Sequence, residues 1–240
     1  MTEILQNLFD ESSVQYHKLG ELYISPEGNK YRYVQAGAVA LATGHLLQEA
    51  AEDTNDRSMA VQAAVAIGDT MIPVTLGGTA VTANKFDEGH IFIESSTGLG
   101  QQFRVVSHQV QTSTTGTCQF NVDRAVKVAL TTSSQASVRK NAYDGVIDFP
   151  VTPTGGAVGV ALYAMTIAYF GWVQSGGDCP VLFDTGTNTS ADVTRLIPSQ
   201  DVAGSVSPDA AANAASPVVG YAREQVSVDS TFGMVHLTID

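Results

Sequence analysis

The feature that most constrains the fold is a series of short apolar runs separated by turn residues along the whole chain. The clearest example is residues 21–34, in which residues 21–25 and 30–34 alternate apolar and polar side chains on either side of a Pro/Gly turn at 26–29. Alternation with a period of two turns one face of a strand toward a core. Residues 21–34 are therefore predicted to form a β-hairpin.

Comparable runs continue toward the C-terminus at short spacing. They lie at residues 71–76, 90–94, 102–107, 119–122, 127–131, 181–184 and 234–239. Many short strands with turns between them are typical of all-β architectures. The predicted fold class is mainly β, with two β-rich units of short antiparallel strands, the C-terminal one a small β-barrel, and an N-terminal arm in front of them.

Two stretches leave the choice between helix and strand open. Residues 36–51 and 58–67 are rich in Ala, Leu and Gln, which favour helix by propensity. Gly37 and Gly44 interrupt the first stretch, and the second runs directly into the turn at 68–69. Within the first twenty residues, Ile4, Leu5, Leu8 and Phe9 fall on one side of a possible short helix.

One uncharged stretch, residues 155–173, is about as long as a bilayer span. It contains four glycines, and no Lys or Arg flanks it to fix an orientation in a membrane. Its β-branched and aromatic residues fit two buried strands instead, at about 157–163 and 166–174. We expect Trp172, with Tyr169 or Phe170 and Val181, to form the core of the C-terminal barrel.

The chain is acidic, and its charge is unevenly distributed. Twelve Lys and Arg against 24 Asp and Glu give a net charge of −12. A surface of that sign repels phosphate backbones and anionic lipids, so neither nucleic acid nor membrane is an expected partner. From Asn141 onward there are ten acidic residues but only two basic ones. This change predicts a boundary near residue 141, and we expect an arm at 1–20, a β-rich domain at 21–140 and a β-barrel domain at 141–240.

The two cysteines, Cys118 and Cys179, are far apart in the sequence and belong to no metal or redox motif. They are expected to be buried free thiols. The first residues are acidic where a secretory signal is basic, and they contain no unbroken apolar stretch. The protein is therefore expected to be made in a reducing cytoplasm.

The sequence contains no catalytic motif that we can identify. It has no nucleophile elbow, no phosphate-binding Gly-x-x-x-x-Gly-Lys and no His-Glu-x-x-His. The densest acidic cluster, Glu49, Glu52, Asp53 and Asp56, lacks the Gly and the distant Glu of a calcium loop. We expect no enzymatic activity, no cofactor and no metal site. A hydrolase whose paired Asp residues meet only in the fold remains an alternative.

Several short motifs resemble the head decoration (cement) proteins of tailed bacteriophages. In the first half they are YRYVQAG at 31–37, LLQ at 46–48, GD at 68–69 with VTLG at 74–77, and ANK at 83–85 with EGH at 88–90. In the second half they are KNAYDGV at 140–146, GVA at 159–161, YFGWVQ at 169–174 with GG at 176–177, and VVGYA at 218–222. The resemblance covers about residues 20 to 240.

This resemblance implies a structural protein of the virion that binds the outer surface of the phage head and stabilises the lattice of major capsid subunits. The implied partners are the major capsid protein and further copies of this chain, in a homotrimer. A host-recognition or tail-associated β module is the alternative from a different class. It would share the short strands, but fibre proteins carry internal repeats, and we find none in the sequence.

The N-terminal arm is the candidate for binding the capsid or another partner. Ile4, Leu5, Leu8 and Phe9 are apolar, and they precede the first clear strand without a local core of their own. Such a segment can lie on a neighbouring subunit or pack on its own barrel. Both possibilities remain open from the sequence.

Overall fold

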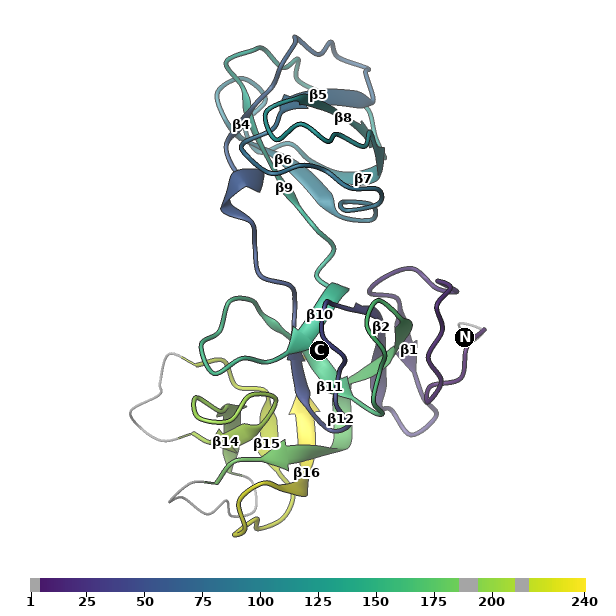
Figure 1. The fold of residues 1–240 in the computed structure, drawn as a ribbon, viewed down its shortest axis with the longest axis vertical. Helices are drawn as coiled ribbons and strands as arrows, with labels where there is room; N and C mark the ends of the chain where they lie inside the picture. Colours follow the sequence, from purple (N-terminus) through teal and green to yellow (C-terminus); the bar gives the residue numbers. More distant parts are fainter. Residues whose placement is uncertain (1–4, 186–193, 210–215) are drawn as a thin grey trace. The chain divides into compact units, whose positions relative to one another are not determined.

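The computed structural model describes residues 5–185, 194–209 and 216–240, and its regular structure is almost entirely β-strand (Figure 1). Among these residues, one 3₁₀ turn, η1 (Thr54–Asp56), is the exception. The predicted mainly-β class is confirmed. Within the described residues no helix is long and apolar enough to cross a membrane.

The chain forms two compact units that do not follow one another in sequence. One consists of Met1–Ala51 together with Ala142–Asp240, and the other is Glu52–Asn141. We call them the two-ring unit and the inserted unit. The expected division at residues 20 and 140 differs from this arrangement, because residues 21–51 pair with strands of the C-terminal part. A change in charge along the chain marks the second boundary but carries no information about strand pairing.

The two-ring unit contains ten strands within the described residues. They are β1 (Leu22–Ile24), β2 (Lys30–Ala36), β3 (Leu46–Gln48), β10 (Asp144–Asp148), β11 (Ala157–Ala161), β12 (Phe170–Phe183), β13 (Arg195–Pro198), β14 (Val206–Pro208), β15 (Gly220–Ala222) and β16 (Thr231–Thr238). The hairpin predicted at 21–34 is confirmed as β1 and β2, in which Tyr23 pairs with Tyr31.

These strands close into two small rings that share β12. The first ring runs β2-β10-β3-β11-β12 and returns to β2, and the second runs β12-β14-β13-β15-β16 and returns to β12. The second ring is formed entirely within residues 170–238, as expected for a small C-terminal barrel. In Figure 1 the yellow β16 lies beside the green β12.

The strand β12 serves both rings because it is long and changes partners part-way. Its first part, up to Gly176, pairs with β2, and its second part pairs with β16. The change occurs at Gly176 and Gly177, next to a register irregularity after Gln174. Gly177 has φ +86°, and a Cβ there would collide with the Asn29 side chain. Glycine therefore permits both the conformation and the close approach at this junction.

Alternation along β2 and β12 separates two sets of buried side chains. Val34 and Val173 point into the core of the first ring, whereas Tyr33 and Trp172, one position earlier, lie on the opposite face. Tyr31, Tyr33 and Trp172 form what we call the aromatic cluster. The core of the second ring contains Cys179, Val181, Phe183, Leu196, Val206, Val219, Ala222, Val226, Val235 and Leu237, together with Leu46, Phe149 and Val160.

The burial predicted for Trp172 is confirmed, but the predicted barrel core is wrong in its grouping. Trp172 is completely buried, yet it belongs to the aromatic cluster, with Phe170 packed beside it. Val181 lies in the core of the second ring, and Tyr169 packs against the core of the first. The sequence could not separate these positions, because the expectation assumed one barrel where β12 contributes to two.

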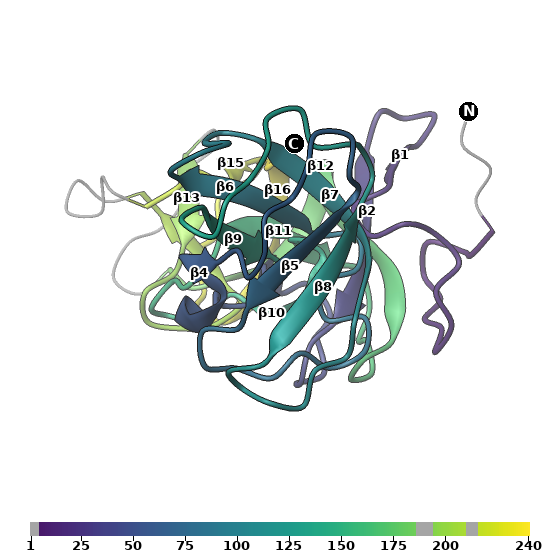
Figure 2. The same cartoon turned by 90° about the horizontal axis from the view of Figure 1, so that it is seen from above.

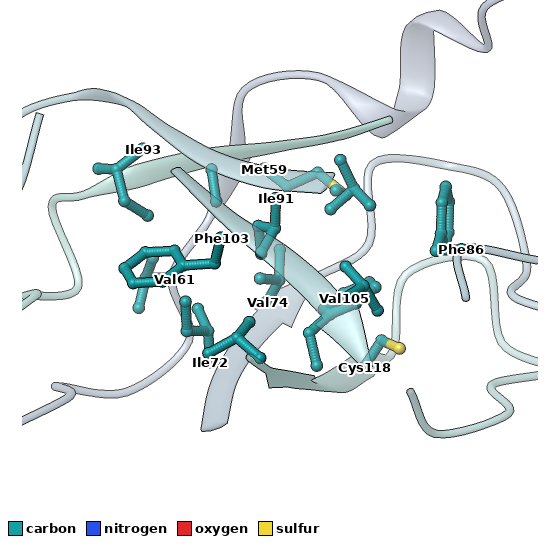
Figure 3. Close-up of a cluster of buried hydrophobic side chains, with 14 of the residues drawn as sticks. Met59, Val61, Ile72, Val74, Phe86, Ile91, Ile93, Phe103, Val105 and Cys118 are labelled. Atoms are coloured by element: carbon teal, nitrogen blue, oxygen red, sulfur yellow. The ribbon is translucent and has the colours of Figure 1, made fainter. Parts of the chain in front are cut away.

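The inserted unit is a single sheet that almost closes on itself. Its strands, β4 (Met59–Ala60), β5 (Met71–Thr75), β6 (His90–Ser95), β7 (Gln102–His108), β8 (Thr117–Val122) and β9 (Gln135–Arg139), are ordered β4-β9-β6-β7-β8-β5. An antiparallel bridge between Val61 and Val74 brings its two edges together. Ile91, Phe103, Val105 and Cys118 are among the side chains that fill its core (Figure 3).

The insertion interrupts the two-ring unit between two strands that are themselves neighbours. Gln48, the last residue of β3, pairs with Ile147 of β10. The chain therefore leaves and re-enters the first ring at adjacent positions, and the ring can close across the insertion. Glu52 forms ion pairs with Arg57 and Arg139, which hold together the two ends of the inserted unit.

Neither stretch with high helix propensity forms a helix. Residues 36–51 contain the end of β2 and all of β3, and residues 58–67 contain β4 with isolated bridges at Val61 and Val65. Pairing with distant strands overrides local propensity at both places. The uncharged stretch at 155–173 forms β11 and the start of β12, so it does contain two strands, although the second begins at Phe170.

Candidate partner-binding surface

The described part of the N-terminal arm packs on the first ring without forming a helix. Ser12 and Phe170 exchange backbone hydrogen bonds of 2.9 and 2.7 Å, so the arm pairs with the start of β12. Gln6 is buried, donates from Nε2 to the Phe170 carbonyl and accepts from the Tyr33 hydroxyl at 2.7 Å. Figure 2 shows this purple segment beside β1 and β2.

His17, near the C-terminal end of the arm, packs against the aromatic cluster. Its ring is buried, with centroids 5.2 Å from Tyr33 and 4.9 Å from Trp172, both in edge-on contacts. Its Nε2 accepts a hydrogen bond from the Leu5 backbone N–H at 3.1 Å, and its Nδ1 lies 3.3 Å from a Glu21 carboxylate oxygen. The arm thus covers the aromatic cluster, which would otherwise face solvent.

The four residues predicted to bind a partner have different environments. Ile4 lies outside the described residues. Leu8 is half-buried against the aromatic cluster. Leu5 and Phe9 are 66% and 61% exposed. Packing of the arm on its own ring, one of the two open alternatives, is what the described residues show, and it leaves two of the apolar side chains available for contact.

Leu5 and Phe9 each line a separate hollow of the two-ring unit. Leu5 borders one of about 500 Å³, together with the segment from Gln15 to Lys18 and Glu21. Phe9 borders one of about 410 Å³, which we call the apolar pocket. The apolar pocket is lined by Phe9, Tyr31, Thr43, Gly44, Ala161, Leu162, Gln174, Cys179, Pro180 and Phe232.

An exposed apolar strip continues from the apolar pocket across the outer face of the second ring. Phe232 and Met234 point outward from β16 and are 56% and 39% exposed. Pro180 of β12 is paired with Met234, and Tyr221 of β15 is 40% exposed on the neighbouring strand. We call these four residues the apolar strip. The sequence predicted a strand at 234–239, and the alternation in TFGMVHLT would have identified Phe232 and Met234 as outward-facing.

Negative charge is concentrated on the two-ring unit. It contains 16 acidic and five basic residues, a net charge of −11, whereas the inserted unit contains eight acidic and seven basic residues, a net charge of −1. Near the apolar strip, Glu224 accepts from the Met234 backbone N–H at 2.8 Å. Asp178 lies 2.7 Å from His236 Nδ1 and 3.6 Å from Arg223 Nε.

The cysteines match the expectation of buried free thiols. Both are unpaired and buried. Burial raises the pKa of Cys118 to about 11 and that of Cys179 to about 12. At neutral pH both side chains are therefore protonated, and a protonated thiol is a weak nucleophile and a weak metal ligand.

Three residues of the acidic cluster, Glu52, Asp53 and Asp56, form ion pairs in the inserted unit, whereas Glu49 lies in the two-ring unit and accepts from the Gly156 backbone N–H at 3.0 Å. Burial raises the pKa of Asp56, whose carboxylate receives hydrogen bonds of 3.0 and 3.2 Å from Lys85. Asp53 caps η1 by accepting from the Asn55 backbone N–H. Asp53 thus stabilises the 3₁₀ turn η1, and Asp56 holds the loop that carries Lys85 beside it. Within the described residues no three His, Cys, Asp or Glu side chains are grouped as a metal site.

Comparison with known proteins gives no match: no family model, no curated protein and no solved structure is similar to this chain. The resemblance of its motifs to phage head decoration proteins stays a prediction.

Proposed function

We propose that this chain is a structural, non-enzymatic virion protein that binds the exterior of a tailed-phage head and stabilises the lattice of major capsid subunits. The observation that carries the proposal is the exposed apolar strip with its adjoining pocket. Exposed apolar side chains grouped beside a pocket are a feature of sites that contact another protein. The resemblance of the sequence motifs is the reason for proposing a capsid subunit as the partner.

The mechanism of stabilisation would be differential binding. A protein that binds the expanded shell more tightly than the unexpanded one shifts the equilibrium toward the expanded form. Each bound copy contributes RT ln(1 + [L]/Kd), so many copies at modest affinity add up to a large effect. In this proposal the protein is made in the host cytoplasm and ends on the outer surface of the head.

The proposal includes self-association as a homotrimer, since closed threefold symmetry would match a threefold site on a head. Light scattering on the purified protein tests it. A trimer at micromolar concentration is expected, and a stable monomer at that concentration would contradict a trimer formed before attachment.

Co-sedimentation with purified heads that lack the protein tests the proposed function. We expect saturable binding to heads and a higher temperature of DNA release from the decorated particles. Binding to purified tails or to host cells, with none to heads, would reject the proposal and favour the host-recognition or tail-associated alternative.

A further inference from the structure

The apolar pocket lies where the two rings meet on β12. Gln174 comes from the part of β12 that belongs to the first ring, and Cys179 and Pro180 come from the part that belongs to the second. The loop at Thr43 and Gly44 closes one side. This loop is fixed to both rings, because Gly44 donates to the Ala161 carbonyl at 2.7 Å and accepts from the Leu182 N–H at 2.9 Å.

Two exposed aromatic rings line the pocket, and each is held by its surroundings. Phe232 lies directly over Gly44, where a Cβ would collide with its ring. Gly44 also has φ +71°, so glycine is required there for two reasons. Phe9 stands on the docked arm, in which the neighbouring Asp10 carbonyl accepts from the Tyr163 hydroxyl at 2.6 Å. The pocket is therefore largely formed before anything binds.

The size and lining of the pocket define what it can hold. Its volume of about 410 Å³ is near the lower end of the ~300–1,000 Å³ typical of ligand sites. Its walls are mainly aromatic, aliphatic and backbone groups, with Gln174 and Thr43 as polar side chains. This combination suits one large apolar side chain better than an extended peptide or a charged ligand.

The charge of the two-ring unit indicates which kind of partner segment could present such a side chain to the pocket. The two-ring unit has a net charge of −11. Asp178, adjacent to the pocket residue Cys179, is 45% exposed but lies 3.6 Å from Arg223 Nε and 2.7 Å from His236 Nδ1, so the preference for a basic partner rests on the net charge of the unit. An acidic partner would be repelled and a basic one attracted, which also raises the rate of encounter.

We propose that the apolar pocket is an anchor site for an aromatic or long aliphatic side chain presented on a basic segment of a partner protein. Aromatic side chains that fill a well-packed pocket are common hot spots of protein interfaces. This inference rests on the proposed function for the identity of the partner, which would be a capsid subunit. The chemistry of the pocket is independent of that identity.

The probe for the test is a capped pentapeptide with a central tryptophan between two pairs of lysines. Its binding to the whole protein is followed by NMR chemical shifts of the backbone amides. We expect saturable shifts at Gly44, Phe9 and Phe232. The affinity of the peptide should fall at least tenfold when alanine replaces the tryptophan or when glutamates replace the lysines. Equal binding of the acidic peptide, or shifts that are absent or lie elsewhere, would overturn the proposal.

Two variants from separate segments, Phe232→Ser and Phe9→Ser, test the assignment of the pocket. Both side chains are exposed, so the fold should persist, and NMR spectra verify this. Val39→Ser is the matched control, because Val39 is 64% exposed in the same unit and does not line the pocket. We expect about tenfold weaker peptide binding for each pocket variant and no change for the control. Unchanged binding in both pocket variants would refute the assignment.

The same proteins incubated with heads separate this inference from the proposed function. Wild-type binding to heads with a matching loss in Phe232→Ser supports both. Failure of the wild type to bind heads, with peptide binding intact, rejects the decoration role and leaves the anchor pocket standing. Binding of Phe232→Ser to heads at wild-type affinity rejects the pocket as the capsid contact.

Discussion

The two-ring unit and the inserted unit consist of similar short strands, but their sheets close in different ways. The inserted unit is continuous in sequence, and one bridge between Val61 and Val74 nearly completes its sheet. The two-ring unit has to join two segments separated by the insertion, through pairing of β2 with β10 and β12. The strands of the inserted unit thus pair within one continuous segment, whereas those of the two-ring unit pair across the insertion.

The two units also differ in their surfaces. The inserted unit is nearly neutral, and the two-ring unit has most of the negative charge, the apolar pocket and the docked arm. Our proposal places partner binding on the two-ring unit, and the following changes test whether the two units fold and unfold separately.

The largest expected effect comes from cutting the chain at the unit boundaries. Residues 52–141 alone should fold, because they keep their own core and the ion pair of Glu52 with Arg139. Residues 142–240 alone should not fold, because β12 loses β2 and the first ring loses two of its strands. Dispersion of amide signals in NMR spectra measures both outcomes. A folded 142–240 fragment would contradict the account of shared pairing.

Trp172→Ala should destabilise the two-ring unit by about 3–5 kcal/mol, since the ring is completely buried among aromatic side chains. Phe120→Ala should have an effect of about the same size confined to the inserted unit, where Phe120 is fully buried. Urea unfolding followed by unit-specific NMR signals separates the two. A single transition shifted equally by both substitutions would show that the units unfold together.

Trp172→Phe sharpens this test. The indole N–H of Trp172 has no hydrogen-bond partner among the described residues, so phenylalanine removes volume and no hydrogen bond. The loss of stability should be smaller than for Trp172→Ala.

Gln6→Ala should loosen the arm at a cost of about 1–3 kcal/mol, because it leaves the buried Tyr33 hydroxyl without its acceptor. Faster amide hydrogen exchange in residues 5–17 would record this, and exchange in the inserted unit should not change. Unaltered exchange in the arm would show that Ser12 and His17 are sufficient to hold it.

The smallest effect concerns Asp240, whose carboxylate accepts from Arg32 Nε at 2.6 Å and from Nη2 at 2.9 Å. The hydrogen bonds from Arg32 hold the pKa of Asp240 below its usual value. The interaction therefore stabilises the fold above the unfolded-state pKa of about 3.9 and is lost as pH falls through the lower folded-state pKa.

Asp240→Asn should accordingly lower stability by about 1 kcal/mol at pH 7 and have little effect near pH 2. Thermal unfolding at the two pH values measures the difference. A deficit that is the same at both would show that the carboxylate charge contributes nothing.

The same contrast explains what the sequence could predict. The β1–β2 hairpin and the strand character of β12 and β16 follow from alternation within a few residues. The discontinuous unit does not, because no local pattern indicates that Tyr33 pairs with Trp172. The apolar pocket does not follow from the sequence for the same reason: Phe9, Gly44 and Phe232 come from three distant segments that meet only in the folded two-ring unit.

The central claim is that the protein is a component of the phage head, and quantitative mass spectrometry of purified heads and purified tails tests it most directly. The account predicts that the chain is found in heads, at a copy number comparable to that of the capsid subunits, and is absent from tails. Its presence in tails alone, or its absence from both, would contradict the account.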